Sequence, residues 1–291
     1  MSISKQLRNI LDSYSMDDYQ DLDYLTHEIK ASISRILKKE YGSKVVAAPV
    51  LSGSLVKGTA INTHFDLDLV IPFSRYAFRT PAHMLEDLYA FFDEEVTLNK
   101  PLELVEVYDQ RVSVGLLLED LETNWEIDVD LVPGLERSLG DYQLSKDLIL
   151  WDSEKEKSIL TNISRQVNSV HSQGNGYPDL VKLMKIWRND YGDEMRMLKS
   201  FVLEMAIQKA FQELPGLRKG PLWERLKMTL LYFRDKFPGA QLPDPGNPHN
   251  LVNGLLERED WDFIAEKAEE TLQDIEEDPD ELTRYFPYNE E

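Results

Sequence analysis

The composition of this chain limits the classes of protein to which it can belong. It has 291 residues, 42% of them hydrophobic, which is enough for one large domain or two ordinary ones with a buried core. Lys and Arg number 32 against 53 Asp and Glu, giving a formal net charge of −21. Proteins that hold long nucleic acids need a basic surface to neutralise phosphates, so tight binding to a tRNA or a long duplex is disfavoured.

The sequence contains no pattern typical of export or membrane insertion. It has no window of 18 or more apolar residues, and its first 20 residues predict an amphipathic helix, not a signal peptide. The absence of cysteine excludes disulfides and thiolate metal sites and is compatible with a reducing compartment. We therefore expect a cytoplasmic protein with no membrane partner.

The first half of the chain predicts a mixed α/β unit. Helical apolar spacing covers residues 1–40, and Tyr41-Gly42-Ser43 ends it. Two strands, a helix and three more strands are expected next, at 45–51, 67–73, 80–98, 103–108, 111–118 and 125–132. Thr80 is the expected N-cap of the helix, and Pro81 lies in its first turn.

The second half of the chain predicts helices. Amphipathic spacing recurs in five segments, at 153–173, 178–191, 198–212, 219–236 and 258–276. We therefore expect an α+β protein with two domains. Residues 1–152 would form an α/β core with a mixed sheet and N-terminal helices, and residues 153–291 a helical domain. Its acidic run at 274–281 is expected to be a solvated tail.

A glycine–serine turn follows the first expected strand. Gly53 and Ser54 precede Gly58-Thr59 in the segment LSGSLVKGT. Glycine allows close backbone approach, so this turn is suited to phosphate oxygens. An ordinary hairpin or strand-to-loop turn would have the same composition.

Asp66 and Asp68 begin the second expected strand. Residues two apart on a strand point to the same face. Two adjacent carboxylates repel each other, and a hard divalent cation is the usual means of keeping both ionised. The alternative is that Asp66 caps a turn and Asp68 lies on a solvated face.

The segment WEIDVDLV at 125–132 is an apolar strand with an acidic face. Alternation places Glu126, Asp128 and Asp130 on the face opposite Ile127 and Val129. Two-metal phosphoryl or nucleotidyl transfer needs a third carboxylate in addition to a pair such as Asp66 and Asp68. A solvated edge-strand face is the alternative.

The order of these motifs resembles the polymerase β-like nucleotidyltransferase superfamily. The matching residues are Gly53, Ser54, Gly58, Thr59, Asp66, Asp68 and Asp130, with Val132-Pro133 after the last. The resemblance implies that Asp66, Asp68 and Asp130 are the catalytic residues and bind two Mg²⁺ or Mn²⁺ ions. The D-L-V-P ending assigns this role to Asp130 in preference to Asp128.

Three features of the second half are similar to oligoadenylate synthetases and their bacterial relatives. They are LVKLMKIW at 180–187, KSFVLE at 199–204 and QLPDPGNPHN at 241–250. The best match over residues 45–260 is the cyclic GMP–AMP synthase-like nucleotidyltransferases (CD-NTases) of bacterial CBASS anti-phage systems. This implies a helical, oligoadenylate-synthetase-like second domain.

The same resemblance implies roles for several polar residues. Gly53, Ser54 and Ser200 would hold the nucleotide triphosphate, and Lys185 would neutralise it. Lys182 and Lys199 are near alternatives. Without the motifs, Lys185 would be an ordinary helix-surface lysine and Ser200 an N-cap. Trp187 is expected in the core, and His64 and His249 have no implied role.

The implied reaction joins nucleoside triphosphates (ATP, GTP, UTP or CTP) into a cyclic di- or trinucleotide that activates a separate effector. Linear 2′-5′ oligoadenylate synthesis, nucleotide addition to an RNA end and modification of a protein or small molecule are alternatives within the enzyme class. A degenerate, nucleotide-binding regulatory module is the alternative of another class, disfavoured because all three aspartates are present.

Overall fold

The computed structural model describes residues 2–16, 22–63, 66–98, 100–174 and 176–289. The chain divides into two compact units. A sheet unit comprises Asp17–Lys57 and His64–Val167, and a helical unit comprises Met1–Met16, Gly58–Thr63 and Asn168–Glu291. The boundary expected between residues 152 and 153 lies inside the sheet unit, and the first helix belongs to the helical unit.

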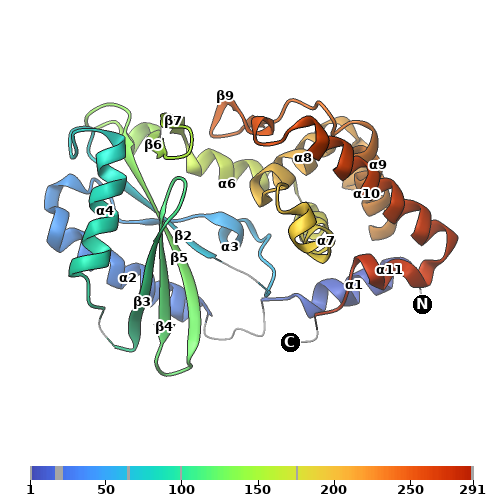
Figure 1. Ribbon diagram of the computed structural model, residues 1–291, viewed down its shortest axis with the longest axis horizontal. Helices are drawn as coiled ribbons and strands as arrows, with labels where there is room; N and C mark the ends of the chain where they lie inside the picture. The colour runs from blue at the N-terminus through green and yellow to red at the C-terminus, as the bar shows by residue number, and fades with distance from the viewer. Residues whose placement is uncertain (1, 17–21, 64–65, 99, 175, 290–291) are drawn as a thin grey trace. The chain divides into compact units, whose positions relative to one another are not determined.

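The sheet unit contains a mixed sheet and flanking helices (Figure 1). Its strands are β1 (Val50–Leu51), β2 (Asp66–Phe73), β3 (Leu102–Asp109), β4 (Val114–Asp120), β5 (Trp125–Glu136), β6 (Leu148–Asp152) and β7 (Lys157–Thr161). Its helices are α2 (Leu22–Tyr41), η1 (Gly42–Lys44), α3 (Gly53–Lys57), α4 (Pro81–Glu95) and α5 (Tyr142–Ser145), and α6 (Ile163–His171) begins in it.

The strand order is β1-β2-β5-β4-β3, and β6 joins β5 to β7. The β2–β5 pair is parallel and the other pairs are antiparallel, which confirms the predicted mixed sheet. One face is apolar and packs against the buried sides of α2 and α4. Its strand residues alternate along the chain, as at Leu67, Leu69 and Ile71 or at Ile127 and Val129.

Several predicted elements in this unit differ from those observed. The helix expected at 153–173 is wrong in its first half, because β6 and β7 pair as an antiparallel hairpin through Asp152 and Lys157. Only α6 keeps the helical part of that prediction. β4 begins at Val114, because Gln110–Ser113 form a turn in which the Gln110 amide donates to the Ser113 carbonyl over 3.2 Å. The expected strand at 45–51 is regular only at Val50–Leu51.

The helical unit is built around an extensive apolar core. Its α-helices are α1 (Ile3–Ser13), α7 (Tyr177–Asp190), α8 (Ser200–Glu213), α9 (Leu222–Asp235), α10 (Arg258–Glu277) and α11 (Leu282–Tyr285). Shorter elements are η2 (Gly192–Met195), η3 (Pro215–Arg218), η4 (Val252–Leu255), η5 (Pro279–Glu281) and a hairpin of β8 (Pro243–Asp244) and β9 (Asn247–Leu251). No helix among the described residues is long and apolar enough to cross a bilayer.

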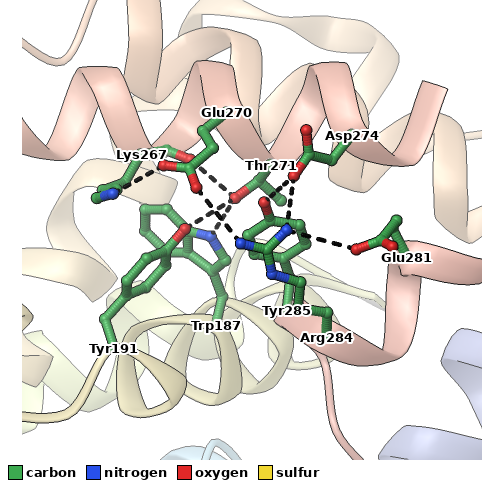
Figure 2. Close-up of polar contacts among 9 residues, drawn as sticks. All are labelled: Trp187, Tyr191, Lys267, Glu270, Thr271, Asp274, Glu281, Arg284 and Tyr285. Atoms are coloured by element: carbon green, nitrogen blue, oxygen red, sulfur yellow. Dashed lines mark hydrogen bonds and ion pairs between the residues drawn. The ribbon is translucent and has the colours of Figure 1, made fainter. Parts of the chain in front are cut away.

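A polar cluster joins α7, α10 and the C-terminal helix inside this unit (Figure 2). The buried Trp187 indole donates to the Thr271 hydroxyl over 2.9 Å, and that hydroxyl donates to the Lys267 carbonyl over 2.8 Å. Since its one proton is used there, the Thr271 oxygen accepts from Tyr191 at 3.3 Å. Trp187 is therefore a core residue, as predicted.

The acidic run at 274–281 is folded and is not a tail, although residues 276–280 are exposed to solvent as expected. It forms the end of α10 and the turn η5. Asp274 accepts hydrogen bonds from Tyr285 and, over 3.0 Å, from Arg284 (Figure 2). Arg284 also approaches Glu281 and Glu270, at 3.5 Å and 3.8 Å. These contacts fix α11 against α10 because one guanidinium group serves several carboxylates.

Candidate active site

The second face of the sheet carries the predicted carboxylates. In the parallel β2–β5 ladder, Asp66 is the Cα partner of Asp128 and Asp68 is that of Asp130. The four side chains share a face because residues two apart on a strand point the same way. The structure therefore brings together Asp66, Asp68 and Asp130, which are 64 residues or fewer apart in sequence.

This face changes from acidic to apolar along the two strands. Val70 and Val132, the next rung after Asp68 and Asp130, are buried against Tyr142, Leu148 and Leu150. Val70 and Val132 therefore form the boundary between the carboxylates and the apolar part of this face. The carboxylates consequently lie on two buried strands, with Asp68 and Asp130 half-buried and Asp66 exposed.

Gly53 lies against one of these carboxylates. β1 is antiparallel to β2, and the Ser52 amide donates to the Asp68 carbonyl over 2.9 Å. Gly53 has φ of +74°, and a Cβ built there would lie 1.6 Å from the Asp68 Oδ2. Only glycine meets both requirements. The next residue, Ser54, is half-buried in the short helix α3, so the predicted phosphate-binding segment is beside the predicted carboxylates.

The carboxyl group of Asp130 is strongly affected by its surroundings. Its burial and the nearby charges of Asp68 and Asp66 raise its pKa to about 7. The Gln110 side-chain amide opposes this effect by donating to Asp130 Oδ1 over 2.7 Å. Asp128 accepts from the Tyr108 hydroxyl over 2.8 Å, and the pKa of Tyr108 is raised by burial and by that bond.

The chemistry of this donor set fits hard divalent cations. Mg²⁺ and Mn²⁺ prefer carboxylate oxygens, and Asp66, Asp68 and Asp130 provide them on adjacent strands. Among the described residues no group of three or more acidic or histidine side chains is already arranged to hold a metal ion. The strand register fixes the backbone positions, and a carboxylate needs only side-chain rotation to change the direction of its oxygens. A cation would also relieve the repulsion that raises the pKa of Asp130.

The two residues predicted in the helical half lie on α7 and α8. Lys185 is 5% exposed, and its Nζ donates to the Thr59 carbonyl over 2.9 Å. It also lies 3.8 Å from Glu204 Oε1, which accepts from the Thr59 hydroxyl over 3.0 Å. Ser200 is the first residue of α8, and its hydroxyl accepts from Arg188 over 2.9 Å. The triphosphate roles of Lys185 and Ser200 stay predictions.

The other residues considered have ordinary positions. Lys182 is half-buried on α7, and Lys199 is exposed just before α8. His249 is exposed on β9, and its amide donates to Asn247 Oδ1 over 3.2 Å. His64 lies outside the described residues.

Sequence reasoning missed Tyr108 and Gln110. No motif marks them, because they contribute through the side chains that they place beside Asp128 and Asp130. One signal was present in the expected strand at 111–118. Gly115 leaves room for the Tyr108 ring, and a Cβ at that position would lie 2.2 Å from a ring carbon.

Comparison with known proteins identifies the fold. No protein-family model matches the chain, and no curated protein does. CdnC of E. coli MS115-1 in complex with HORMA-deltaN is similar with a TM-score of 0.69 and 20% identity, over 96% of this chain and 92% of that one. The structure of the same CdnC with ATP is similar with a TM-score of 0.71 and 19% identity, over 96% of this chain and 94% of that one.

A second solved structure has the same architecture. The CdnE cyclic dinucleotide synthase of Elizabethkingia meningoseptica, with GTP and Apcpp, gives a TM-score of 0.63 and 15% identity over 84% of this chain and 91% of that one. The α+β class with a mixed sheet and following helices is thereby confirmed. The chain has the fold of CdnC and of the CdnE cyclic dinucleotide synthase.

Proposed function

We propose that this protein is a CD-NTase that joins nucleoside triphosphates into a cyclic di- or trinucleotide, acting as a signal in anti-phage defence. The observation that carries the proposal is the β2–β5 register, which pairs Asp68 with Asp130 and places Asp66 on the same face. The fold shared with CdnC, solved with ATP, and with CdnE, solved with GTP and Apcpp, supports nucleoside triphosphate substrates.

The reaction would form a bond between a ribose hydroxyl oxygen and an α-phosphorus and break the α–β phosphoanhydride bond, releasing pyrophosphate. Asp66, Asp68 and Asp130 would hold two Mg²⁺ or Mn²⁺ ions. When bound, such cations lower the pKa of the attacking hydroxyl and neutralise charge on the leaving pyrophosphate. The protein's own part is to position the triphosphate, through the Gly53-Ser54 backbone and the Ser54 hydroxyl, beside Asp68.

Lys185 and Ser200 are proposed as further triphosphate contacts on α7 and α8. The product would act on a separate effector protein. The net charge of −21 favours free nucleotides over a polynucleotide as substrates, because binding a long phosphate chain needs many basic side chains.

The test is incubation of the full chain with the four ribonucleoside triphosphates and Mg²⁺ or Mn²⁺. Products would be treated with phosphatase and identified by mass spectrometry. A phosphatase-resistant product of cyclic mass is expected. Phosphatase-sensitive oligomers would favour linear synthesis, and no product with either metal would contradict the proposal.

Asp68→Asn provides the variant for that assay. It removes one charge from the carboxylate face while keeping the size of the side chain, so we expect turnover to fall by about 10³-fold or more with the fold intact. Asp262→Asn is the matched control, because Asp262 is exposed on α10. Equal activity of the two variants would exclude Asp68 from the site.

A further inference from the structure

The hairpin of β3 and β4 lies next to the carboxylate face. β4 pairs with β5 so that Gly115 is the Cα partner of Asp130, and β3 pairs with β4 so that Tyr108 is the partner of Gly115. Because β4 lies between β3 and β5, a side chain of β3 can reach β5 only by crossing over β4. Gly115 of β4 makes this possible, since the Tyr108 ring occupies the space that a Cβ of residue 115 would fill.

Gln110, in the turn of this hairpin, is held in one orientation. The Ser113 hydroxyl, which is 3% exposed, donates to Gln110 Oε1 over 2.7 Å. The amide nitrogen of Gln110 then donates to Asp130 Oδ1 over 2.7 Å. Because an amide presents its donor and its acceptor in fixed positions, the bond from Ser113 determines that a donor faces Asp130.

Tyr108 makes an equivalent hydrogen bond to the preceding carboxylate of β5, Asp128. Its hydroxyl donates to Asp128 Oδ1 over 2.8 Å. Residues 108 and 110 are two apart, as are 128 and 130, so the hairpin supplies one neutral donor to each carboxylate of β5. A neutral donor orients a carboxylate without cancelling its charge, which a lysine or arginine would do.

The one cationic residue of the turn is directed to another partner. Arg111 donates to both oxygens of Asp152, at 2.9 Å and 2.6 Å, and Asp152 is fully buried at the end of β6. The Ser153 amide and hydroxyl also donate to the Arg111 carbonyl, at 2.9 Å and 3.1 Å. These bonds fix the turn, so the positions of Gln110 and Ser113 do not depend on the carboxylate face itself.

We propose that Gln110 is a positioning residue that holds Asp130 in the orientation needed to bind a divalent cation, with Ser113 fixing the Gln110 amide. Within the part of the chain that the structure describes, Gln110 is the one side chain that donates to Asp130. One carboxylate oxygen is held, and the remaining lone pairs stay available to a cation. The inference rests on the proposed function, in which Asp130 is a metal ligand. Outer partners of this kind change metal affinity by about 10- to 100-fold.

The test is Mn²⁺ binding to the full-length protein, measured by electron paramagnetic resonance without nucleotide. Gln110→Met keeps the length of the side chain and removes its donor, and we expect about 10- to 100-fold weaker Mn²⁺ binding. Ser113→Ala should give a smaller loss, because the amide keeps its donor but not its fixed orientation. Gln143→Met is the control, since the Gln143 side chain is exposed on α5 and donates to the Val46 carbonyl over 3.2 Å.

Steady-state rates provide a second readout. Gln110→Met should raise the Mg²⁺ concentration for half-maximal rate by a similar factor, with kcat recovered at saturating metal and the KM for nucleotide little changed. A purely structural role would lower the thermal midpoint without moving the metal dependence. If Gln110→Met does not fold, Ser113→Ala tests the inference through its smaller expected loss of Mn²⁺ affinity.

The outcomes separate this inference from the proposed function. If wild type binds Mn²⁺ and Asp130→Asn does not, unchanged binding in Gln110→Met and Ser113→Ala overturns the role of Gln110 alone. If wild type binds no Mn²⁺, the metal site itself is contradicted and both proposals fail.

Discussion

Asp130 is held by β5 beside two other carboxylates, and its burial together with Asp68 and Asp66 raises its pKa to about 7 from an ordinary value of 3.8. The unfolded chain therefore releases this proton more readily than the folded one. Below pH 3.8 Asp130 is protonated in both the folded and the unfolded chain, and its pKa shift does not affect the free energy of unfolding. As the pH rises from 3.8 to about 7, the unfolded chain loses this proton while the folded chain keeps it, so the free energy of unfolding falls across this range.

Asp130→Asn should therefore stabilise the metal-free protein while it abolishes turnover. The amide oxygen still accepts from Gln110, but the charge is gone. In EDTA, the unfolding free energy of the variant should exceed that of wild type by an amount that grows by about 1–2 kcal/mol from pH 5 to pH 8, after discounting for solvent screening. Urea unfolding measures this difference, and Mg²⁺ should then stabilise wild type but not the variant.

Asp152→Asn is the control of opposite sign. The pKa of Asp152 is lowered, first of all by hydrogen bonds from Arg111, so its charged form stabilises the fold above its ordinary pKa. The same substitution there should destabilise the protein at pH 8. If the difference in unfolding free energy between Asp130→Asn and wild type did not change with pH, the pKa of Asp130 would not be raised by its neighbours.

In the part of the chain that the structure describes, the Thr271 hydroxyl of α10 makes a buried side-chain hydrogen bond with α7. Thr271 accepts from the indole of Trp187, and both side chains are fully buried (Figure 2). Thr271→Val keeps the shape of the side chain but leaves the indole N–H without its acceptor. We expect a loss of about 1–3 kcal/mol in the free energy of unfolding, measured by urea denaturation.

Thr229→Val is a closely matched control for this prediction. Thr229 is also fully buried, and its hydroxyl donates to the Arg225 carbonyl four residues earlier, as the hydroxyl of Thr271 does to the Lys267 carbonyl. The two threonines differ because Thr271 also accepts from the buried indole of Trp187. Thr229→Val should therefore be close to neutral, and equal losses in the two variants would contradict the role given to the indole bond.

Strand and helix periodicity predicted most elements of both units. β2 and β5 were predicted because apolar and acidic residues alternate along them, and α7 because its apolar residues recur at helical spacing. The β6–β7 hairpin was missed, since its second strand, KSILT, is only partly apolar and is stabilised by pairing with β6. Pairing between strands is a tertiary effect that local periodicity does not record.

The carboxylates that belong to sequence motifs could be predicted from the sequence, and their neighbours could not. Asp66, Asp68 and Asp130 follow from alternation and motif order, and the β2–β5 register brings them together. Tyr108 and Gln110 were not predictable, because their contacts with Asp128 and Asp130 depend on the register of three strands and on the space at Gly115. Neighbours of this kind are set by the fold and not by spacing in the sequence.

The whole chain crosses between its two units several times. Residues Gly58–Thr63 belong to the helical unit although they follow α3 of the sheet unit directly. Within the helical unit this short segment is held by α7 and α8, because Thr59 bonds to both Lys185 and Glu204. Thr59 is fully buried and Glu204 is 2% exposed, so the network links three distant parts of the chain in a dry environment.

The position of Lys185 in this network determines how its predicted triphosphate role must be tested. Lys185→Met would remove the ammonium group that lies 3.8 Å from the buried Glu204 carboxylate, at a cost of about 3–5 kcal/mol in the free energy of unfolding. Combining it with Glu204→Gln removes both charges, so the double variant should be less destabilised than the sum of the single changes. Urea unfolding of the four proteins measures this coupling.

Nucleotide affinity in the double variant then isolates the role of the lysine. If Lys185 neutralises the triphosphate, the double variant should bind ATP with Mg²⁺ about 10-fold more weakly than wild type, which corresponds to one lost charge contact. Glu204→Gln alone keeps the lysine and should keep most of the affinity. Wild-type affinity in a folded double variant would instead restrict Lys185 to holding Gly58–Thr63 on α7 and α8, because both variants lack the Glu204 charge and differ only at Lys185.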